Sequence, residues 1–203
     1  NGKIVPALAE KWEISDDALV WTFYLKKNVE FHNGNKLTSK DVKATFEYAS
    51  DVNKAAGAWY PGPCEVEVVD RLTCRVHTEK YGYPAYHFWY QSSFLPIMSA
   101  NDIKDPKILA QRLNGTGPFK FVKQDKDNTV MASNENYFKG APKIKDLHFI
   151  YVPDSTTRLI SLQSGEADVI ERLESEQVDV VEKDKNLKLN TAVSVENKYL
   201  WFR

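Results

Sequence analysis

The stretch between residues 21 and 48 constrains the fold more than any other part of the sequence. It begins with alternating side chains, the pattern of a half-buried β-strand, whose apolar members are Trp21, Phe23 and Leu25. The Asn33-Gly34 dipeptide then predicts a tight turn, because both residue types tolerate a positive φ angle. A strand, a turn and a helix are therefore expected in succession.

The residues after this turn carry the signals of a helix amino terminus. Thr38 can cap the free amides of the first turn, and Asp41 can reach back to it. Leu37 and Val42 occupy the two positions of a hydrophobic staple. Spacing of three and four residues then predicts one buried helix face, made of Val42, Thr45, Phe46 and Ala49.

The second half of the chain carries a glycine-rich turn among strand and helix signals. Residues 114–119 read Asn-Gly-Thr-Gly-Pro-Phe, which predicts a sharp turn into a strand at 119–122. This turn is not a phosphate-binding loop, because no Gly-Lys-Ser/Thr follows and it leads into a strand. The other expected elements are a hairpin of 66–69 and 73–77, a helix within 102–113 that Pro106 begins or breaks, strands at 147–152 and 188–195, and a helix at 175–183.

A further helix is expected directly after the 147–152 strand. Asp154 or Ser155 can cap its start, and Gly165 signals its end. Its spacing predicts three core-facing side chains, Leu159, Ile160 and Leu162.

Only two cysteines, Cys64 and Cys74, occur in the sequence, which excludes a disulfide-dense scaffold. A hairpin that turns at Asp70-Arg71 is expected to place Cys74 opposite Glu67. Cys64 would then lie about three residues, or about 10 Å, out of register, which is too far for a bridge unless the chain bends. The Pro61-Gly62-Pro63 segment could supply that bend, so a bridged and an unbridged pair both stay open.

Composition and charge exclude several classes of protein. The 203 residues are 42% hydrophobic and 27% charged, which is ordinary for a globular chain. With 27 basic and 28 acidic residues the formal net charge is −1, so no electrostatic attraction to nucleic acid or to an anionic membrane is expected. No apolar run approaches the length of a membrane span.

The sequence offers little for catalysis or for a metal centre. Glu166 and Asp168 are carboxylates two residues apart, but their place at a helix end favours a role in the turn over acid–base chemistry. The four histidines share no ligand spacing with cysteines or carboxylates. No Gly-x-Ser-x-Gly elbow is present. We therefore expect no enzymatic activity, no cofactor and no protein-built metal site.

Several stretches, in order along the chain, resemble the family-5 extracellular solute-binding proteins, the oligopeptide, dipeptide and nickel receptors of ABC importers. The family pattern P-x-L-A-E-x-W corresponds to residues 6–12, and W-T-F-x-L-[RK]-x-[GD]-V-x-F-[HS]-[DN]-G corresponds to residues 21–34. One departure is Asn28, where many members have glycine. The later patterns L-T-x-x-D-V, G-T-G-P-[FY], Y-[WF]-x-G-x-P and S-G-E-x-D match residues 37–42, 115–119, 137–142 and 164–168.

The resemblance implies a mixed α/β fold, that of lobe I of a type II periplasmic-binding protein. Residues 1–98 would form the extra subdomain that distinguishes the peptide- and nickel-binding cluster, β-rich with helices, and residues 99–203 would form most of the remainder of lobe I. Lobe II, the amino-terminal strands of lobe I and an export leader would all lie outside this sequence. The incomplete sheet would then have unpaired edges that are prone to associate.

The same resemblance implies a function in binding and transport. The chain would belong to the substrate-binding component of an ABC importer, which captures a peptide, a nickel chelate or a related small solute outside the membrane and delivers it to the permease. The complete protein would be an extracytoplasmic monomer, in the periplasm or as a surface lipoprotein, that meets the membrane only through a lipid anchor or the permease. The alternative is the solute-sensing domain of a transcription regulator built on the same module.

The resemblance also indicates where lobe I meets the ligand: the loop after the first helix, the end of an aromatic stretch, the residues after S-G-E-x-D, and the strand that crosses into lobe II. The implied ligand-binding residues are Trp59, Tyr60, Tyr90, Gln91, Glu171, Arg172, Glu196 and Tyr199. Arg172 could hold a carboxylate or an anionic chelate in bidentate fashion. The alternatives are a salt bridge from Arg172 to Glu171, Glu174 or Glu176, and packing of Trp59 and Tyr60 on the lobe itself.

Overall fold

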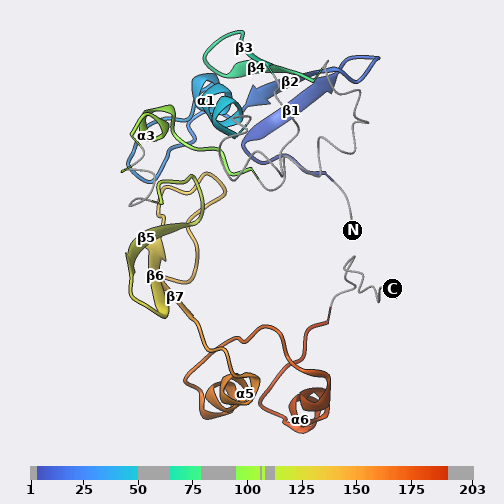
Figure 1. Ribbon diagram of the computed structural model, residues 1–203, viewed down its shortest axis with the longest axis vertical. Helices are drawn as coiled ribbons and strands as arrows, with labels where there is room; N and C mark the ends of the chain where they lie inside the picture. The colour runs from blue at the N-terminus through green and yellow to red at the C-terminus, as the bar shows by residue number, and fades with distance from the viewer. Residues whose placement is uncertain (1–3, 50–64, 79–94, 106, 108–112, 192–203) are drawn as a thin grey trace, which may run out of the picture. The chain divides into compact units, whose positions relative to one another are not determined.

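The computed structural model describes residues 4–49, 65–78, 95–105, 107 and 113–191. The chain forms two compact units, Asn1–Phe149 and Ile150–Arg203. Among the described residues, the first unit is built on two β-sheets and the second on short helices (Figure 1).

A four-stranded sheet organises the first part of the chain. Its strands are β1 (Ala9–Ile14), β2 (Val20–Leu25), β3 (Glu65–Val68) and β4 (Thr73–His77), in the spatial order β1-β2-β4-β3. Each neighbouring pair is antiparallel. The alternation predicted for this stretch is confirmed, since Trp21 and Leu25 are buried and Phe23 packs partly buried against the same core.

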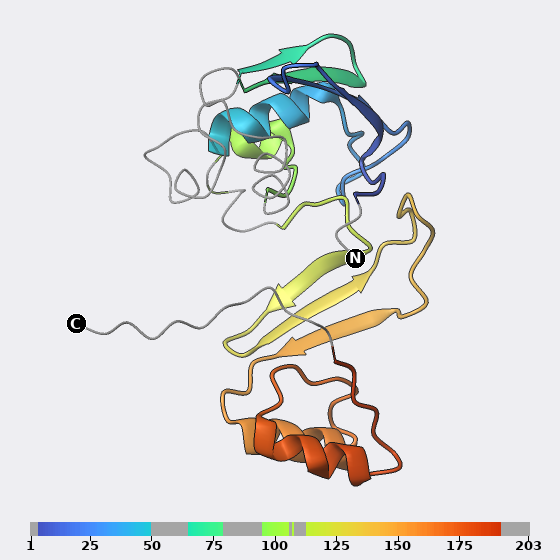
Figure 2. The same cartoon turned by 90° about the vertical axis from the view of Figure 1, so that its right-hand side faces the viewer.

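Helix α1, Ser39–Ala49, covers one face of this sheet (Figure 2). The predicted helix face is confirmed, because all four of its members are buried. Its apolar side chains join those of the strands in one cluster, which consists of Trp21, Leu25, Val42, Phe46, Ala49, Val66, Cys74, Val76 and Leu95. Fully burying a large apolar side chain contributes roughly 1.5–3 kcal/mol relative to leaving it exposed, so this cluster is a main source of the sheet's stability.

Polar groups fix the amino-terminal end of α1. Asp41 Oδ2 accepts hydrogen bonds from the amide and the hydroxyl of Thr38, both at 2.8 Å, so Asp41 reaches back to the cap as predicted. The fully buried Ser39 donates from its amide to the carbonyl of Arg71 at 2.9 Å and from its hydroxyl to the carbonyl of Asp70. These bonds attach the turn between β3 and β4 to the helix.

Thr45, buried one turn further along, attaches α1 to the chain beyond residue 95. Its hydroxyl oxygen accepts from the amide of Met98 at 2.9 Å and lies 2.7 Å from the carbonyl oxygen of Asp41, to which it donates. Asp41 Oδ1 accepts from the amide of Ala100 at 2.9 Å. The helix therefore holds the backbone that leads into α3, Ala100–Ile103.

The helix expected within 102–113 is broken at Pro106, as the sequence allowed. α3 begins at Ala100, two residues earlier than expected, and ends at Ile103, because the residue preceding a proline is driven out of the helical region. Lys107, directly after Pro106, is again helical. Leu113, expected on the apolar face, is 62% exposed. Residues 108–112 lie outside the described part of the chain.

Two turn positions in the 21–48 stretch have left-handed backbone. Gly34 has φ 86°, as the Asn33-Gly34 turn predicts, and its amide donates to the carbonyl of Phe31 at 2.8 Å. Asn28 has φ 60°, a conformation that asparagine tolerates better than most non-glycine residues. Asparagine therefore adopts here a backbone conformation that glycine also favours.

The His32 side chain joins this stretch to the glycine-rich turn at 114–119. Its Nδ1 accepts from the amide of Gly115 at 3.3 Å, and its Nε2 lies 3.0 Å from the carbonyl oxygen of Gly117. Because Nδ1 is the acceptor, Nε2 carries the proton and donates. Neither glycine has a positive φ, so this turn is held by contacts with His32 and Asn134, whose Nδ2 also donates to the Gly117 carbonyl at 3.0 Å.

The hairpin of β3 and β4 forms at the predicted place with a register shifted by one residue. Cys74 pairs with Val68, and Glu67 pairs with Arg75, whose guanidinium lies 3.1 Å from the Glu67 carboxylate. The turn holds one residue more than expected because the amides of residues 69 and 70 both donate to the Thr73 carbonyl. Cys74 is a buried free thiol and is not bridged; Cys64 lies outside the described residues.

A second, three-stranded sheet follows. It consists of β5 (Phe119–Gln124), β6 (Asn128–Ser133) and β7 (Asp146–Ile150) in the order β5-β6-β7 (Figure 2). The predicted 119–122 strand is confirmed and extends two residues further, whereas the strand expected at 147–152 ends at Ile150. Several apolar side chains on and beside β5 and β7 are more than half exposed, namely Val122, Ile144, Phe149, Ile150 and Tyr151.

The second unit contains α5 (Ser155–Ser164), a 3₁₀ turn at Ser175–Gln177 and α6 (Val178–Lys183). The predicted ends of α5 are confirmed, with Asp154 as the amino-terminal cap and Gly165, at φ 79°, as the carboxy-terminal cap. Leu159 is buried as expected, but Ile160 is 57% exposed, so that part of the predicted face is wrong. Of the strand expected at 188–195, the described residues 188–191 are not in strand conformation.

Candidate functional site

The predicted ligand-binding residues fall mostly outside the described part of the chain. Glu171 and Arg172 are described, and both are exposed. The other six are not described, and these are Trp59, Tyr60, Tyr90, Gln91, Glu196 and Tyr199. The part of the candidate site that can be built from residues upward is therefore the segment between α5 and the 3₁₀ turn, residues 166–174.

The backbone of this segment is strained at Arg172. Its φ is 59°, in the left-handed region where the Cβ of an ordinary side chain meets the following carbonyl. Such a conformation costs of the order of 1–2 kcal/mol and persists only where surrounding contacts hold it. Contacts on both sides of Arg172 supply that restraint.

The first contact is made by Arg158 of α5. Its Nη2 donates to the carbonyl of Arg172 at 3.0 Å, and its Nη1 donates to the carbonyls of Val152 and Pro153 at 2.8 and 2.9 Å. One guanidinium therefore joins three backbone carbonyls, two before the helix and one after it. Bonds from a charged donor are stronger than neutral ones.

The second contact lies directly after Arg172. Glu174 and Gln177 form a capping box, in which the Glu174 amide donates to Gln177 Oε1 at 3.2 Å and the Glu174 side chain accepts from the Gln177 amide. Gln177 is buried. Arg172 is thus held between Arg158 on one side and the cap of the 3₁₀ turn on the other.

The Arg172 guanidinium forms no ion pair with any described residue. The salt-bridge alternative named Glu171, Glu174 and Glu176, and all three are described. None of them lies within 4.0 Å of an Arg172 nitrogen, and Glu174 is engaged in the capping box instead. The Arg172 side chain therefore projects from a held backbone without a carboxylate partner in the described part of the second unit.

Sequence reasoning did not single out Arg158. A signal for it was present, because a cation near the amino-terminal end of a helix opposes the helix dipole and calls for another reason to be there. The reason is the set of three carbonyls, which supply negative partial charge around the guanidinium. Their convergence could not be seen in the sequence, since Arg158 and Arg172 are 14 residues apart.

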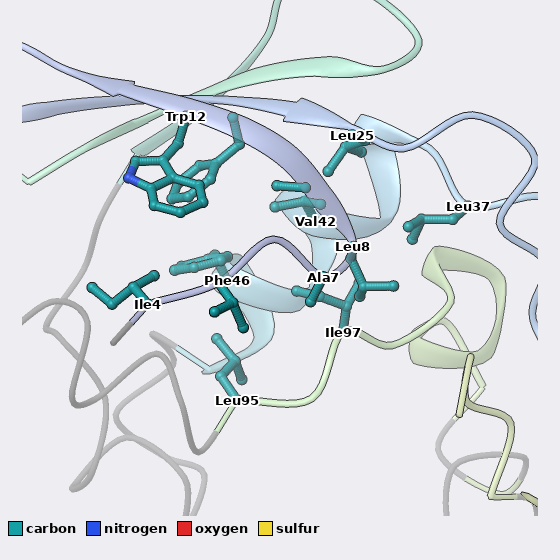
Figure 3. A pocket seen from close by; sticks show the side chains of 13 residues that line it. Ile4, Ala7, Leu8, Trp12, Leu25, Leu37, Val42, Phe46, Leu95 and Ile97 are labelled. Carbon is teal, nitrogen blue, oxygen red and sulfur yellow. The ribbon is translucent and has the colours of Figure 1, made fainter. Parts of the chain in front are cut away.

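The first unit contains an apolar pocket of about 260 Å³ between the sheet, α1 and the segments next to residues 5 and 95 (Figure 3). Its lining is Ile4, Val5, Ala7, Leu8, Ala9, Trp12, Phe23, Leu25, Leu37, Val42, Phe46, Leu95 and Ile97. None of these side chains carries a charge, and five of them are buried core residues. A ligand site needs polar groups that fix orientation, so this lining is that of a core and not of a solute pocket.

Two further observations bear on the class of protein. Among the described residues, no three His, Cys, Asp or Glu side chains gather so that they could hold a metal ion. No helix in the described ranges is long and apolar enough to cross a membrane.

The fold and the sequence together assign the chain to a family. Residues 3–203 match the family described as bacterial extracellular solute-binding proteins, family 5 Middle, and the chain belongs to that family. The heme-binding protein A of Haemophilus influenzae is 35% identical over 193 residues, covering 82% of this chain and 35% of that protein. The nickel-binding periplasmic protein of Escherichia coli is 28% identical over 184 residues, covering 84% of this chain and 33% of that protein.

Solved structures give the same result. NikZ from Campylobacter jejuni, determined in complex with Ni(L-His), superposes with a TM-score of 0.78 at 25% identity, covering 89% of this chain and 37% of that one. DppA from Helicobacter pylori, in complex with the peptide STSA, superposes with a TM-score of 0.76 at 27% identity, covering 91% of this chain and 41% of that one. The predicted family and its mixed α/β lobe fold are confirmed, and the chain spans roughly a third to two fifths of the length of these relatives.

Proposed function

We propose that this chain is part of the solute-capturing component of an ABC importer, which binds a small solute outside the membrane and passes it to a permease. The observation that carries this proposal is the match of residues 3–203 to the solute-binding family, on a fold that superposes on NikZ and DppA. Members of the family are binding proteins and not enzymes, so the mechanism is non-covalent capture.

The solute is proposed to be a peptide or a small chelate that carries a carboxylate. The relatives' names include heme, nickel, glutathione, dipeptides and tripeptides. What supports a carboxylate is Arg172, whose planar guanidinium can donate two parallel hydrogen bonds and is not paired with its glutamate neighbours. Glu171 beside it is proposed to receive a cationic or hydrogen-bonding group of the same solute.

Six further residues complete the proposed site. They lie outside the described residues and are carried over by resemblance to the family, namely Trp59, Tyr60, Tyr90, Gln91, Glu196 and Tyr199. Aromatic side chains in such a set would supply apolar walls, while the charged and amide groups would fix orientation.

Native mass spectrometry of the complete protein, purified from its host, tests this function. A co-purifying peptide, heme or metal chelate that leaves on mild unfolding is the expected result, and its mass names the solute class. A protein that carries no solute, and that also shows no calorimetric binding to a peptide mixture or to Ni(L-His), would contradict the proposal. For the 203-residue chain alone we expect affinity no tighter than millimolar, because half of a two-lobed site leaves the solute open to water.

A further inference from the structure

We propose that Arg158 is a positioning residue, which holds Arg172 in its left-handed conformation so that the Arg172 guanidinium is preformed to bind the carboxylate of the solute. This inference rests on the proposed function for its second half only. The first half, the hold of one arginine on the other, is a property of the chain without ligand.

The contacts of Arg158 leave its guanidinium committed to the backbone. Both terminal nitrogens donate to carbonyls, at 2.8 and 2.9 Å to residues 152 and 153 and at 3.0 Å to Arg172. A guanidinium is rigid and planar, so these three bonds fix the distance between the start of α5 and the turn at residue 172. Lysine cannot reproduce this geometry, because its three donors radiate from one nitrogen and cannot match the two separate nitrogens of a rigid planar guanidinium.

The identity of residue 172 is informative in its own right. A glycine would adopt φ 59° without steric cost, yet the chain has an arginine there. An arginine side chain is therefore present at a position where the backbone conformation alone would favour glycine. Strained positions of this kind are characteristic of binding and catalytic segments, where the restraint comes from neighbouring groups.

The charges around Arg172 narrow the ligand class. Arg172 is the only cation between residues 166 and 182, a stretch whose acidic side chains are Glu166, Asp168, Glu171, Glu174, Glu176, Asp179 and Glu182. A polyanion would be repelled by so many carboxylates. A small solute with one carboxylate can meet the guanidinium in bidentate fashion.

Limited trypsin digestion of the complete protein, as its gene encodes it, tests the hold without any ligand. Trypsin cleaves after arginine, and the bond after Arg172 contains the carbonyl that Arg158 holds. In Arg158→Gln, we expect the fragment ending at Arg172 to appear about tenfold faster, since local opening becomes easier. Arg158→Lys is expected to give a similar increase, because the fork is lost. Cleavage after Lys183 in the same digest is expected to stay within about twofold and reports whether the whole unit has opened.

An unchanged rate of cleavage after Arg172 in Arg158→Gln would show that Arg158 does not restrain Arg172. Equal acceleration of cleavage after Arg172 and after Lys183 would overturn the inference as well. Arg75→Gln serves as the matched control, because the Arg75 guanidinium on β4 pairs with Glu67 on β3 and its loss should leave the Arg172 rate unchanged. If Arg158→Gln fails to fold, the wild-type and Arg158→Lys digests decide the question.

Arg172→Gly tests the second half. Glycine removes the backbone strain at residue 172, so the melting temperature of this variant is expected to equal or exceed that of the wild type. Calorimetry with the peptide STSA and with its carboxy-terminal amide gives the binding readout. We expect Arg172→Gly to lower the affinity for the free acid about tenfold or more, and to change the affinity for the amide by about twofold or less. Equal losses for both peptides would overturn the carboxylate contact. If the wild type binds neither peptide, this tetrapeptide is excluded as a solute, whereas the digestion still decides the role of Arg158.

Discussion

The bonds between His32 and the glycine-rich turn predict a measurable loss of stability when the imidazole is removed. The change is His32→Ala, which deletes the acceptor of the Gly115 amide and the donor to the Gly117 carbonyl. The backbone bond from the His32 amide to the Gly115 carbonyl, at 2.8 Å, stays in place. The substitution therefore isolates the ring.

The magnitude follows from the number and kind of bonds lost. A neutral intramolecular hydrogen bond contributes about 0.5–1.5 kcal/mol net, so two of them give an expected loss of about 1–3 kcal/mol in the free energy of unfolding.

Urea unfolding of the complete protein, followed by tryptophan fluorescence, measures this loss. Trp21 has no exposed surface and lies in the same unit as His32, so its emission reports the transition. The matched control is His148→Ala, because His148 is exposed on β7 and its ring makes no hydrogen bond with the described residues. A His32→Ala loss no larger than that of the control would refute the reasoning.

Three further residues give testable predictions. Thr45→Val leaves the amide of Met98 without the buried hydroxyl that accepts from it, so urea unfolding should show a loss of about 1–3 kcal/mol, and a loss below about 0.5 kcal/mol would contradict this. Burial raises the pKa of the Cys74 thiol to about 12, so iodoacetamide at pH 8 should label Cys74 only after unfolding. The stability contributed by that neutral thiol is present below about pH 9 and lost as pH rises towards 12, which urea titrations across this range would detect. Hydrogen bonds from the hydroxyl and then the amide of Thr157 lower the pKa of Asp154. The stability that this cap contributes is therefore present above about pH 3.8 and lost as pH falls. Circular dichroism should show that Asp154→Ala has less helix than the wild type at pH 7 and loses less of its helix on acidification.

Local features of the fold were predictable because their partners are close in sequence. Asp41 reaches Thr38 across three residues, and Asp154 caps α5 from the position directly before it. Alternation in β2 and spacing in α1 likewise follow from strand and helix periods, since Trp21 and Phe46 face the same core. These patterns need no knowledge of the rest of the chain.

The errors have equally local causes. The spacing predicts both Leu159 and Ile160 on the apolar face of α5, but only Leu159 of these two is buried, because a short helix with few apolar positions does not fix its rotation by spacing alone. The register of Cys74 depends on the length of the turn. Two backbone hydrogen bonds to the Thr73 carbonyl make this turn one residue longer than expected. Turn length is set by backbone hydrogen bonds that no side-chain pattern displays.

The candidate site was predictable only as far as the family resemblance reached. Arg172 came from its position after S-G-E-x-D, but its left-handed backbone and its bond from Arg158 depend on contacts across a turn. The two patterns around His32 and Gly117 were read as separate features, although one imidazole joins them. Ligand residues outside the described ranges stay predictions.

The bonds of α1 to later parts of the chain also set an order for folding during synthesis. Thr45 bonds to Met98, which is made 53 residues later, and His32 bonds to Gly117, which is made 85 residues later. At about 5–20 residues per second, the ribosome needs roughly 3–10 seconds to reach the first of these partners and somewhat longer to reach the second. During that interval Thr45 and Asp41 keep their local hydrogen bonds within α1 and to Thr38, but lack the amides of Met98 and Ala100 that bind them in the folded chain. The first strands and helix therefore gain these long-range bonds only well after they have been made.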